Sequence, residues 1–512
     1  MVRKAHRSVR LLIGSGSLLA LGCALSLGAA GLVQSQPAAP AAPAAPGTAA
    51  TPPAAGVQPQ AAQALPALRD DQVQLLVKTL ADAESHGFRS SEFARPGLDA
   101  LLASRDAAER QRGLVLLQRV MLDYAKAQHG LRLQGVDLPD EWSIKPAAYD
   151  AQADFNFALQ QDKLAEWVAS LPPPFERYRI LRTALGQYRA IAAKGGWEPI
   201  AAGPSLKPGM SDQRVVQLRR RLAAENPPGS IELTSPVYDP QLAAIVASAQ
   251  ARYGLDPDGV VGPGVLKALN APVEARISQI AANMERWRWM PRAWPATRVE
   301  VNIAGARLNV YDQNRPVSEM KVVVGAPDKK TPMLRSEIHS VVLNPPWNVP
   351  SSIATKELLP KGEAYLARNN FIRVSDGAGG SRLQQRPGPG NSLGRIKFDF
   401  NNPFGVYLHD TNAKAVFERD TRSVSHGCVR VERPEELANL LLGTDPDWSA
   451  EQIGLALADT ETVRKPLAQK IPVMLLYWTV FTGPSGEVNF RNDVYGWDDR
   501  LTNLLNRGGI AA

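Results

Sequence analysis

Cys428 is the residue of this chain with the clearest capacity for covalent chemistry. The 512 residues contain two cysteines, and the other, Cys23, lies in an apolar N-terminal stretch. Exported proteins normally keep their cysteines in pairs, because oxidising compartments convert them to disulfides. The unpaired cysteine in Ser425-His426-Gly427-Cys428-Val429-Arg430 is therefore predicted to be a nucleophile, with a buried structural thiol as the alternative.

Three neighbours of Cys428 supply what such a nucleophile needs. A free thiol titrates near 8.5, so only about a few per cent is thiolate at neutral pH and a base is required. His409 lies 19 residues earlier, at the end of a predicted strand, and His426 shares a face with Cys428 in an extended segment. Gly427 allows close backbone approach, so the N–H groups of residues 427 and 428 are candidates for an oxyanion hole.

Other polar and aromatic residues nearby have two interpretations each. Arg430 lies two residues after Cys428, so in an extended segment their side chains point to the same face. Its guanidinium is suited to a carboxylate. It is equally suited to an ion pair with Glu432 or Glu435. Trp347 and Tyr407 are either substrate contacts or core aromatics.

The segments that carry these residues alternate with period two. Such patterns at 299–303, 308–310, 322–324 and 341–343 predict strands, and further strands are expected at 396–400 and 406–409. A helix is expected at 435–442, and residues 471–481 with 488–490 are expected to close as a hairpin. Residues 351–395 begin with a short helical stretch and become rich in Gly, Arg and Gln, which is typical of a lid or binding insertion. We therefore predict a mostly β domain over 297–495 and a C-terminal tail over 496–512.

The N-terminal third has a different composition. Residues 1–10 carry four basic residues and no acid, and 11–33 are uncharged, which indicates an export signal or a retained membrane anchor. Acylation of Cys23 as a lipoprotein is the third alternative. Residues 34–66, rich in Ala, Pro and Gln, are predicted to be a linker. Helical periodicity over 67–200 predicts a helical scaffold.

Charge excludes nucleic acid as a partner. The formal net charge is +8, but without the four basic residues of the first ten, 54 basic residues face 50 acidic ones. This excess is too small and dispersed for a nucleic-acid footprint and fits mild attraction to a cell wall.

Residues 203–271 predict helix, helix, tight turns, helix. The turn Asp258-Gly259-Val260-Val261-Gly262-Pro263 is followed by Leu266 and Leu269-Asn270. This segment resembles the small peptidoglycan-binding module of wall-active enzymes. The resemblance implies affinity for glycan or stem peptide, or a scaffolding role.

The second half of the chain resembles the L,D-transpeptidase (YkuD-type) catalytic domain. The resemblance rests on His409, fifteen intervening residues and Ser425-His426-Gly427-Cys428, with Arg430 where most members have Asn. Larger members with a scaffold and a peptidoglycan-binding module share that departure. Further shared motifs are 324–333, 344–350, 387–394 and 407–411. The implied fold is a multidomain α+β chain with a helical scaffold, a three-helix module and a β-sandwich-like catalytic domain with a capping insertion at about 351–395.

The resemblance also implies a reaction. Cys428 attacks the carbonyl between the third residue of a stem tetrapeptide and its terminal D-alanine, and an amine of a neighbouring stem resolves the thioester to a 3→3 cross-link. His409 is the base in both steps, the Asp410 carbonyl orients its ring, and His426 and Gly427 support the oxyanion or donor. Substrate contacts are assigned to Ser425, Tyr407, Trp347, Asn348 and Arg430.

Two other functions remain open at this stage. Water instead of an amine would make the chain an L,D-carboxypeptidase, and a degenerate site would leave a peptidoglycan-binding protein without catalysis. No cofactor and no metal are expected. Peptidoglycan stem peptides are the expected partner, other wall-synthesis enzymes are possible partners, and contact with the membrane is expected only through residues 11–33. The expected location is the periplasm.

Overall fold

The computed structural model describes residues 67–133, 138–226, 229–375, 377, 380–443, 445–483 and 485–507. They belong to one compact unit, Pro66–Ala512. The predicted signal or anchor (1–33), the linker (34–66) and Cys23 lie outside the described residues, as do residues 508–512. Within the described residues, no helix combines the length and apolarity that a membrane span requires.

The scaffold consists of helices that bury a shared apolar core. The longest helix, α4, begins where the Asp106 side chain accepts a hydrogen bond from the Glu109 N–H, a standard N-terminal cap. Leu117, Met121 and Phe155 are fully buried in this core. The helices of this core are α1 (Asp70–Ala81), α2 (Ser90–Phe93), α3 (Leu98–Ala103), α4 (Ala107–Gln128), α5 (Ala151–Gln160) and α6 (Leu164–Ser170). Helix α7 (Glu176–Ala193) follows them but buries its apolar residues in the larger core of the chain.

The small module has the predicted order of helices. Helices α8 (Gln213–Ala223), α9 (Pro240–Tyr253) and α10 (Pro263–Leu269) follow one another. Asp212 and Asp239 cap α8 and α9, and Gly254 ends α9 in the left-handed region, with φ of 71°.

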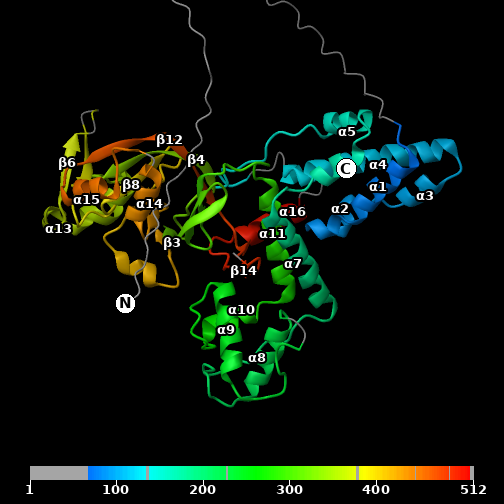
Figure 1. The fold of residues 1–512 in the computed structure, drawn as a ribbon, viewed down its shortest axis with the longest axis horizontal. Coiled ribbons are helices and arrows are strands. Elements are labelled where there is room, and N and C mark those ends of the chain that lie inside the picture. Colours follow the sequence, from blue (N-terminus) through cyan, green and yellow to red (C-terminus); the bar gives the residue numbers. More distant parts are fainter. Residues whose placement is uncertain are drawn as a thin grey trace, which may run out of the picture. The chain divides into compact units, whose positions relative to one another are not determined.

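Helix α11 (Val273–Arg288) lies between the module and the first strand and is buried on most sides. It contacts α7 and helix α16 (Trp497–Arg507), and the three run through the centre of the described structure (Figure 1). Trp287 of α11 stacks on Trp478 and Trp294, with ring centroids 4.7 Å and 5.4 Å away. The sequence analysis did not assign this helix.

The C-terminal domain is built around a β-sheet that closes on itself. Its order is β10-β3-β11-β9-β8-β4-β12-β1-β2, and β2 also pairs with the long strand β3. The N-terminal part of β3 pairs with β2 and its C-terminal part with β11, which completes the closure. The strands are β1 (Arg298–Asn302), β2 (Arg307–Asp312), β3 (Arg315–Gly325), β4 (Leu334–Leu343), β8 (Ile396–Phe400), β9 (Leu408–His409), β10 (Ser423–Ser425), β11 (Val429–Val431) and β12 (Val463–Leu476). Helices α14 (Pro434–Leu442) and α15 (Ala450–Ala458) pack against it. The predicted fold class, with helical scaffold, helical module and mostly β domain, is confirmed.

The capping insertion is a small subdomain with its own core. A three-stranded sheet, β5 (Trp347–Asn348), β7 (Ser381–Gln385) and β6 (Phe371–Ser375), packs with α12 (Ser351–Ile353), the π-helical turn η3 (Ala354–Leu358) and α13 (Glu363–Arg368). Val349, Leu366 and Leu383 are among its buried residues.

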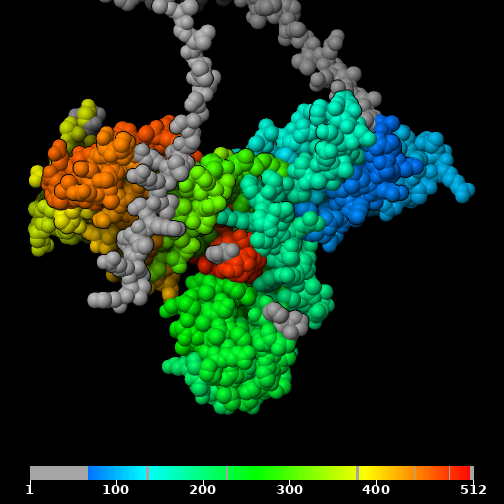
Figure 2. All heavy atoms as spheres, in the orientation of Figure 1, coloured from blue at the N-terminus to red at the C-terminus, as the bar shows by residue number. Residues whose placement is uncertain are grey.

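The C-terminal segment differs from the expected long hairpin. Strand β12 ends at Leu476, and the hairpin consists of β13 (Val480–Thr482) and β14 (Val488–Phe490) only. The segment expected as a tail contains α16, in which Trp497 and Leu501 are buried. In Figure 2 the C-terminal residues, in red, are bordered by green and cyan-green parts of the chain. The hairpin β13–β14 contacts α7, α9 and α11, and α16 contacts α11.

Candidate active site

A cavity of about 970 Å³ opens between the closed sheet and the capping insertion. Eight residues that the sequence singled out line it together: Trp347, Asn348, Tyr407, His409, Ser425, His426, Cys428 and Arg430. Asp410 and Gly427 belong to the same segments but do not line the cavity. The structure thus brings together residues that are up to 83 positions apart in the sequence.

The turn that carries Cys428 is held by hydrogen bonds from buried side chains. Ser425 Oγ donates to the Cys428 carbonyl at 2.6 Å and accepts the Gly427 N–H at 3.1 Å. Thr331 Oγ1 donates to the Gly427 carbonyl at 2.7 Å. Gly427 has φ of 113°, in the region that favours glycine, so this residue allows the turn to form. Ser425, expected to contact substrate, therefore also shapes the turn.

The same hydrogen bonds decide which backbone donor is free. The Gly427 N–H is engaged by Ser425 Oγ, so it is not available to an oxyanion in this conformation. The Cys428 N–H has no hydrogen-bond partner among the residues that the structure describes. Of the two donors that the sequence suggested, the Cys428 N–H is the one available.

Cys428 is a free, half-buried thiol. Burial raises its pKa, because a thiolate loses hydration there. The backbone and hydroxyl of Tyr407 donate to the sulfur and act in the opposite direction, as do the positive charges of Lys397 and Arg430. The resting residue is therefore a thiol with groups in place to stabilise its anion.

His409 reaches the cavity from the strand beside Cys428. Strands β9 and β11 are parallel, with Leu408 opposite Val429 and His409 opposite Arg430. Burial and the charge of Arg430 lower the His409 pKa to about 3, while the backbone at Asp410 and Leu393 acts in the opposite direction. Nδ1 of His409 is buried without a partner of normal hydrogen-bond geometry in the described part of the chain. The ring is neutral at neutral pH.

The Asp410 side chain has a separate task. Its carboxylate accepts the Arg395 N–H at 2.8 Å and pairs with Lys414 Nζ at 2.5 Å. These contacts hold the end of the insertion against strand β9. Of the groups of Asp410, the backbone rather than the carboxylate acts on the pKa of His409.

Arg430 makes no ion pair with a described carboxylate. Glu432 instead pairs with Arg433 at 2.9 Å, and the Arg430 Nε is buried without a hydrogen-bond partner among the described residues. Burial lowers its pKa, and the nearby Cys428 acts against that shift. A half-buried guanidinium that lines the cavity and has no carboxylate partner among the described residues fits the binding of a substrate carboxylate.

His426 contacts a residue that the sequence analysis missed. Its Nε2 lies 2.7 Å from Oε1 of Glu357, which belongs to η3 of the capping insertion, and the same oxygen accepts from Lys329 Nζ at 3.0 Å. Hydrogen bonds from His426 and Lys329 lower the Glu357 pKa. The only signal in the sequence was the position of Glu357 in an insertion expected to act as a lid.

The three remaining predicted contacts, Trp347, Asn348 and Tyr407, also line the cavity. Trp347 is half-buried and packs near Phe371, with ring centroids 6.2 Å apart, so it is both core and lining. Asn348 is exposed and accepts a hydrogen bond from Gln384 at 2.7 Å. The Tyr407 ring lies 5.5 Å from that of His409 and beneath Lys397 Nζ at 4.2 Å.

Comparisons with known proteins assign the parts of the chain. Residues 296–455 match the family described as "L,D-transpeptidase catalytic domain", 66–185 match "Scaffold domain" and 211–269 match "Putative peptidoglycan binding domain". The chain contains an L,D-transpeptidase catalytic domain. The suspected family resemblance is thereby confirmed.

Similarity to individual proteins covers only part of the chain. A Haemophilus influenzae protein named "Putative L,D-transpeptidase" is 32% identical over 249 residues, 44% of this chain and 50% of that protein. The chain thus matches half the length of this curated relative. Solved L,D-transpeptidases from Mycobacterium smegmatis (14% identity, 35% of this chain and 58% of that one) and Xylanimonas cellulosilytica (17%, 55% and 100%) have TM-scores of 0.19 and 0.18. Scores this low carry no argument.

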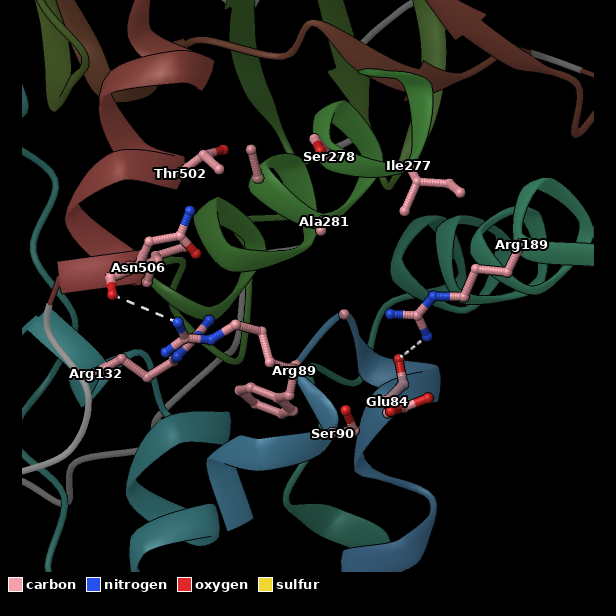
Figure 3. A pocket seen from close by; sticks show the side chains of 14 residues that line it. Glu84, Arg89, Ser90, Arg132, Arg189, Ile277, Ser278, Ala281, Thr502 and Asn506 are labelled. Atoms are coloured by element: carbon pink, nitrogen blue, oxygen red, sulfur yellow. Dashed lines mark hydrogen bonds between the residues drawn. The ribbon is translucent and has the colours of Figure 1, made fainter. Parts of the chain in front are cut away.

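A second cavity, of about 480 Å³, shares no lining residue with the first (Figure 3). Residues from the scaffold, α7, α11 and α16 surround it. Arg132 at its wall pairs with Glu92 and Glu285, and Arg189 donates to the Glu84 carbonyl. None of its lining residues is a cysteine or a histidine, so the reactive groups are concentrated in the first cavity. The described residues contain no cluster of metal-ligating side chains.

Proposed function

We propose that this chain is a cysteine-dependent L,D-transpeptidase that forms 3→3 cross-links in peptidoglycan. The observation that carries the proposal is the free Cys428 thiol in a cavity with His409, Tyr407 and Arg430, within an L,D-transpeptidase catalytic domain. The peptidoglycan-binding module supports peptidoglycan as the substrate. We further propose a periplasmic location, on the basis of the basic and apolar N-terminal sequence.

The first half of the reaction transfers the donor stem to the enzyme. Cys428 Sγ attacks the carbonyl that precedes the terminal D-alanine as His409 accepts the thiol proton. The Cys428 N–H donates to the developing oxyanion, and Tyr407 and Lys397 stabilise negative charge on sulfur. The C–N bond then breaks, the D-alanine amine takes the proton, and a thioester remains on Cys428.

Arg430 orients the donor stem in this half-reaction. Its side chain is half-buried, has no carboxylate partner among the described residues, and lies on the strand that follows Cys428. The carboxylate of the scissile D-alanine matches this cation. The second half transfers the acyl group from Cys428 to an amine of a neighbouring stem.

The test uses full-length protein with tetrapeptide-bearing muropeptides. D-Alanine release, a Cys428 thioester and cross-linked dimers are expected from the wild type, all followed by mass spectrometry. Cys428→Ser should lower D-alanine release by at least about a thousandfold, because a serine hydroxyl forms an anion far less readily than a thiol. Full activity in Cys428→Ala would overturn the proposal.

The products also separate the other functions. Tripeptide monomers without dimers would identify an L,D-carboxypeptidase, in which water resolves the thioester. Absence of both D-alanine release and thioester, with retained binding to peptidoglycan sacculi, would identify a binding protein.

A further inference from the structure

A 3→3 cross-link fixes one property of the donor stem. In such a link, the amine that attacks the thioester belongs to the third residue of the neighbouring stem. Donor and acceptor stems are copies of the same unit, so the third residue of the donor carries a side-chain amine as well. That amine takes no part in the attack by Cys428, and the cavity must accommodate it as an ammonium group.

Two carboxylates line the cavity among the residues that the structure describes, those of Asp328 and Glu357. An alkyl ammonium is charged at neutral pH and binds most strongly to an ionised carboxylate. Asp328 is exposed in the loop between β3 and β4, and its carboxylate has no hydrogen bond or ion pair with a described residue. Glu357 differs, because neighbouring side chains hold its carboxylate in place.

Glu357 is held through one of its two oxygens. Oε1 lies 2.7 Å from Nε2 of His426 and 3.0 Å from Nζ of Lys329. These hydrogen bonds lower the pKa of Glu357, so the carboxylate is ionised at neutral pH. Oε2 has no hydrogen-bond partner in the described part of the chain, and the side chain is 40% exposed where it lines the cavity. The free oxygen is therefore an oriented acceptor for a cationic group.

The position of Glu357 suits the donor stem. His426 is two residues from Cys428, so its partner Glu357 is held beside the turn that carries the nucleophile. Glu357 belongs to η3 of the capping insertion, whereas Arg430, which fits the donor carboxylate, belongs to β11 of the closed sheet. The cavity thus receives a cation from the sheet and an anion from the insertion. A donor with a terminal carboxylate and a side-chain ammonium matches both charges.

We propose, as a consequence of the function proposed above, that Glu357 binds the side-chain ammonium of the donor's third residue and selects donors in which this amine is free. Oε2 accepts hydrogen bonds from the ammonium, while Oε1 stays with His426 and Lys329. Glu357 is then a specificity-determining residue of the first half-reaction. Lys329 and Lys356 also line the cavity and weaken the attraction for a cation, so the discrimination is moderate.

The experiment compares two donors on the full-length protein. One is a tetrapeptide muropeptide with a free side-chain amine on its third residue, and the other is the same compound with that amine acetylated. Single-turnover release of D-alanine gives the second-order rate constant for acylation of Cys428, before any acceptor is used. The wild type should prefer the free amine about tenfold, as one charge-assisted hydrogen bond provides. Glu357→Gln should reduce this preference to about twofold or less by slowing the free-amine donor, and Glu357→Asp should retain part of it.

Asp328→Asn is the matched control. Asp328 lines the same cavity, but its carboxylate is not held by any described residue. The substitution removes one negative charge from the cavity and should leave the preference for the free amine intact. Loss of the preference in Asp328→Asn but not in Glu357→Gln would assign the ammonium to Asp328 instead.

Other results would also overturn this assignment. Equal slowing of both donors in Glu357→Gln would mean that Glu357 supports the shape of the cavity and does not bind the amine. An unchanged preference, or a wild type without preference, would mean that no donor ammonium binds at Glu357. Slower dimer formation with an unchanged preference would place the acceptor amine there. Absence of D-alanine release by the wild type from either donor would instead contradict the proposed function itself.

Discussion

At the scale of single residues, Tyr407 is the principal group that tunes the nucleophile. Its backbone and hydroxyl both donate to Cys428, and the nearby sulfur contributes to the raised pKa of Tyr407 itself. Lys397 Nζ above the ring adds positive charge on the same side. Burial and these donors oppose one another, so the reactivity of Cys428 depends on how well Tyr407 is held.

Replacement of Tyr407 tests this balance. Tyr407→Phe removes a hydroxyl donor from the thiolate, so the Cys428 pKa should rise further. The rate of alkylation by iodoacetamide, measured against pH, should reach its midpoint at higher pH than in the wild type. In both proteins this midpoint should lie above the ordinary thiol value, because burial already raises the pKa.

Tyr365→Phe provides the comparison. Tyr365 lines the same cavity, from the capping insertion, and is not among the main influences on the Cys428 pKa. The midpoint of the alkylation rate against pH in Tyr365→Phe should match that of the wild type. An unchanged midpoint in Tyr407→Phe would show that the Tyr407 hydroxyl does not stabilise the anion.

The sequence predicted the residues that line the cavity with Cys428 better than their partners. Cys428, His409 and His426 were identifiable because an unpaired cysteine and two histidines have few other uses at that spacing. Glu357 lies 69 residues before His426, in a segment without periodicity, so nothing local connected the two. The engagement of the Gly427 N–H by Ser425 depends on a φ of 113°, which a sequence does not display.

At the scale of elements, the junction between the capping insertion and strand β9 is closely packed. Gly394 ends the insertion with φ of 64°, and a Cβ there would lie 2.2 Å from Asp410 Oδ2. The same carboxylate oxygen accepts the Arg395 N–H. The insertion is thus fixed directly beside His409.

A methyl group at position 394 should disturb this junction. Gly394→Ala must adopt an unfavourable backbone and displace the Asp410 carboxylate, at an expected cost of order 1–3 kcal/mol in unfolding free energy. D-Alanine release should fall about tenfold through misplacement of His409. Urea unfolding and the release assay measure the two effects.

Gly454→Ala is the control for this substitution. Gly454 lies within α15 and has no atom within 4 Å of an added Cβ, so the alanine should stabilise the helix by about 0.5–1 kcal/mol. Equal behaviour of the two variants would contradict the role given to the Gly394–Asp410 contact.

Elements were predictable where their periodicity was simple. The strands around His409 and the three module helices alternate or repeat clearly, and the structure contains them. Helix α11 was missed because it is buried on most sides, with Arg286 and Arg288 inside, so it lacks the polar face that marks an amphipathic helix. Residues 471–481 are apolar except for Thr479, and only tertiary contacts decide that the strand ends at Leu476.

At the scale of the whole molecule, the scaffold supports the active-site turn through the backbone. Met333 exchanges hydrogen bonds with the scaffold, its N–H donating to the Glu141 carbonyl at 2.7 Å and its carbonyl accepting from Ser143 at 3.0 Å. Two residues earlier, Thr331 donates to the Gly427 carbonyl. The scaffold therefore contributes to the geometry around Cys428 and is more than a spacer.

Buried ion pairs join the scaffold to α11 and give the last prediction. Glu285 of α11 is fully buried and accepts from Arg132 at 3.0 Å and from Arg288 at 2.7 Å. Glu285→Gln removes the negative charge that neutralises the buried guanidinium groups of Arg132 and Arg288. Arg132 keeps its ion pair with Glu92. The unfolding free energy should fall by about 3–5 kcal/mol.

The matched control is Glu166→Gln in α6, whose pair with Lys163 is 3.8 Å long and exposed. An exposed pair contributes about 0–1 kcal/mol, so this variant should unfold close to the wild type. Urea unfolding followed by tryptophan fluorescence measures both, since Trp287 and Trp289 flank the Glu285 network. If Glu285→Gln were as mild as Glu166→Gln, the junction would not depend on this charge, and hydrophobic packing around Trp287 would have to hold scaffold and catalytic domain together.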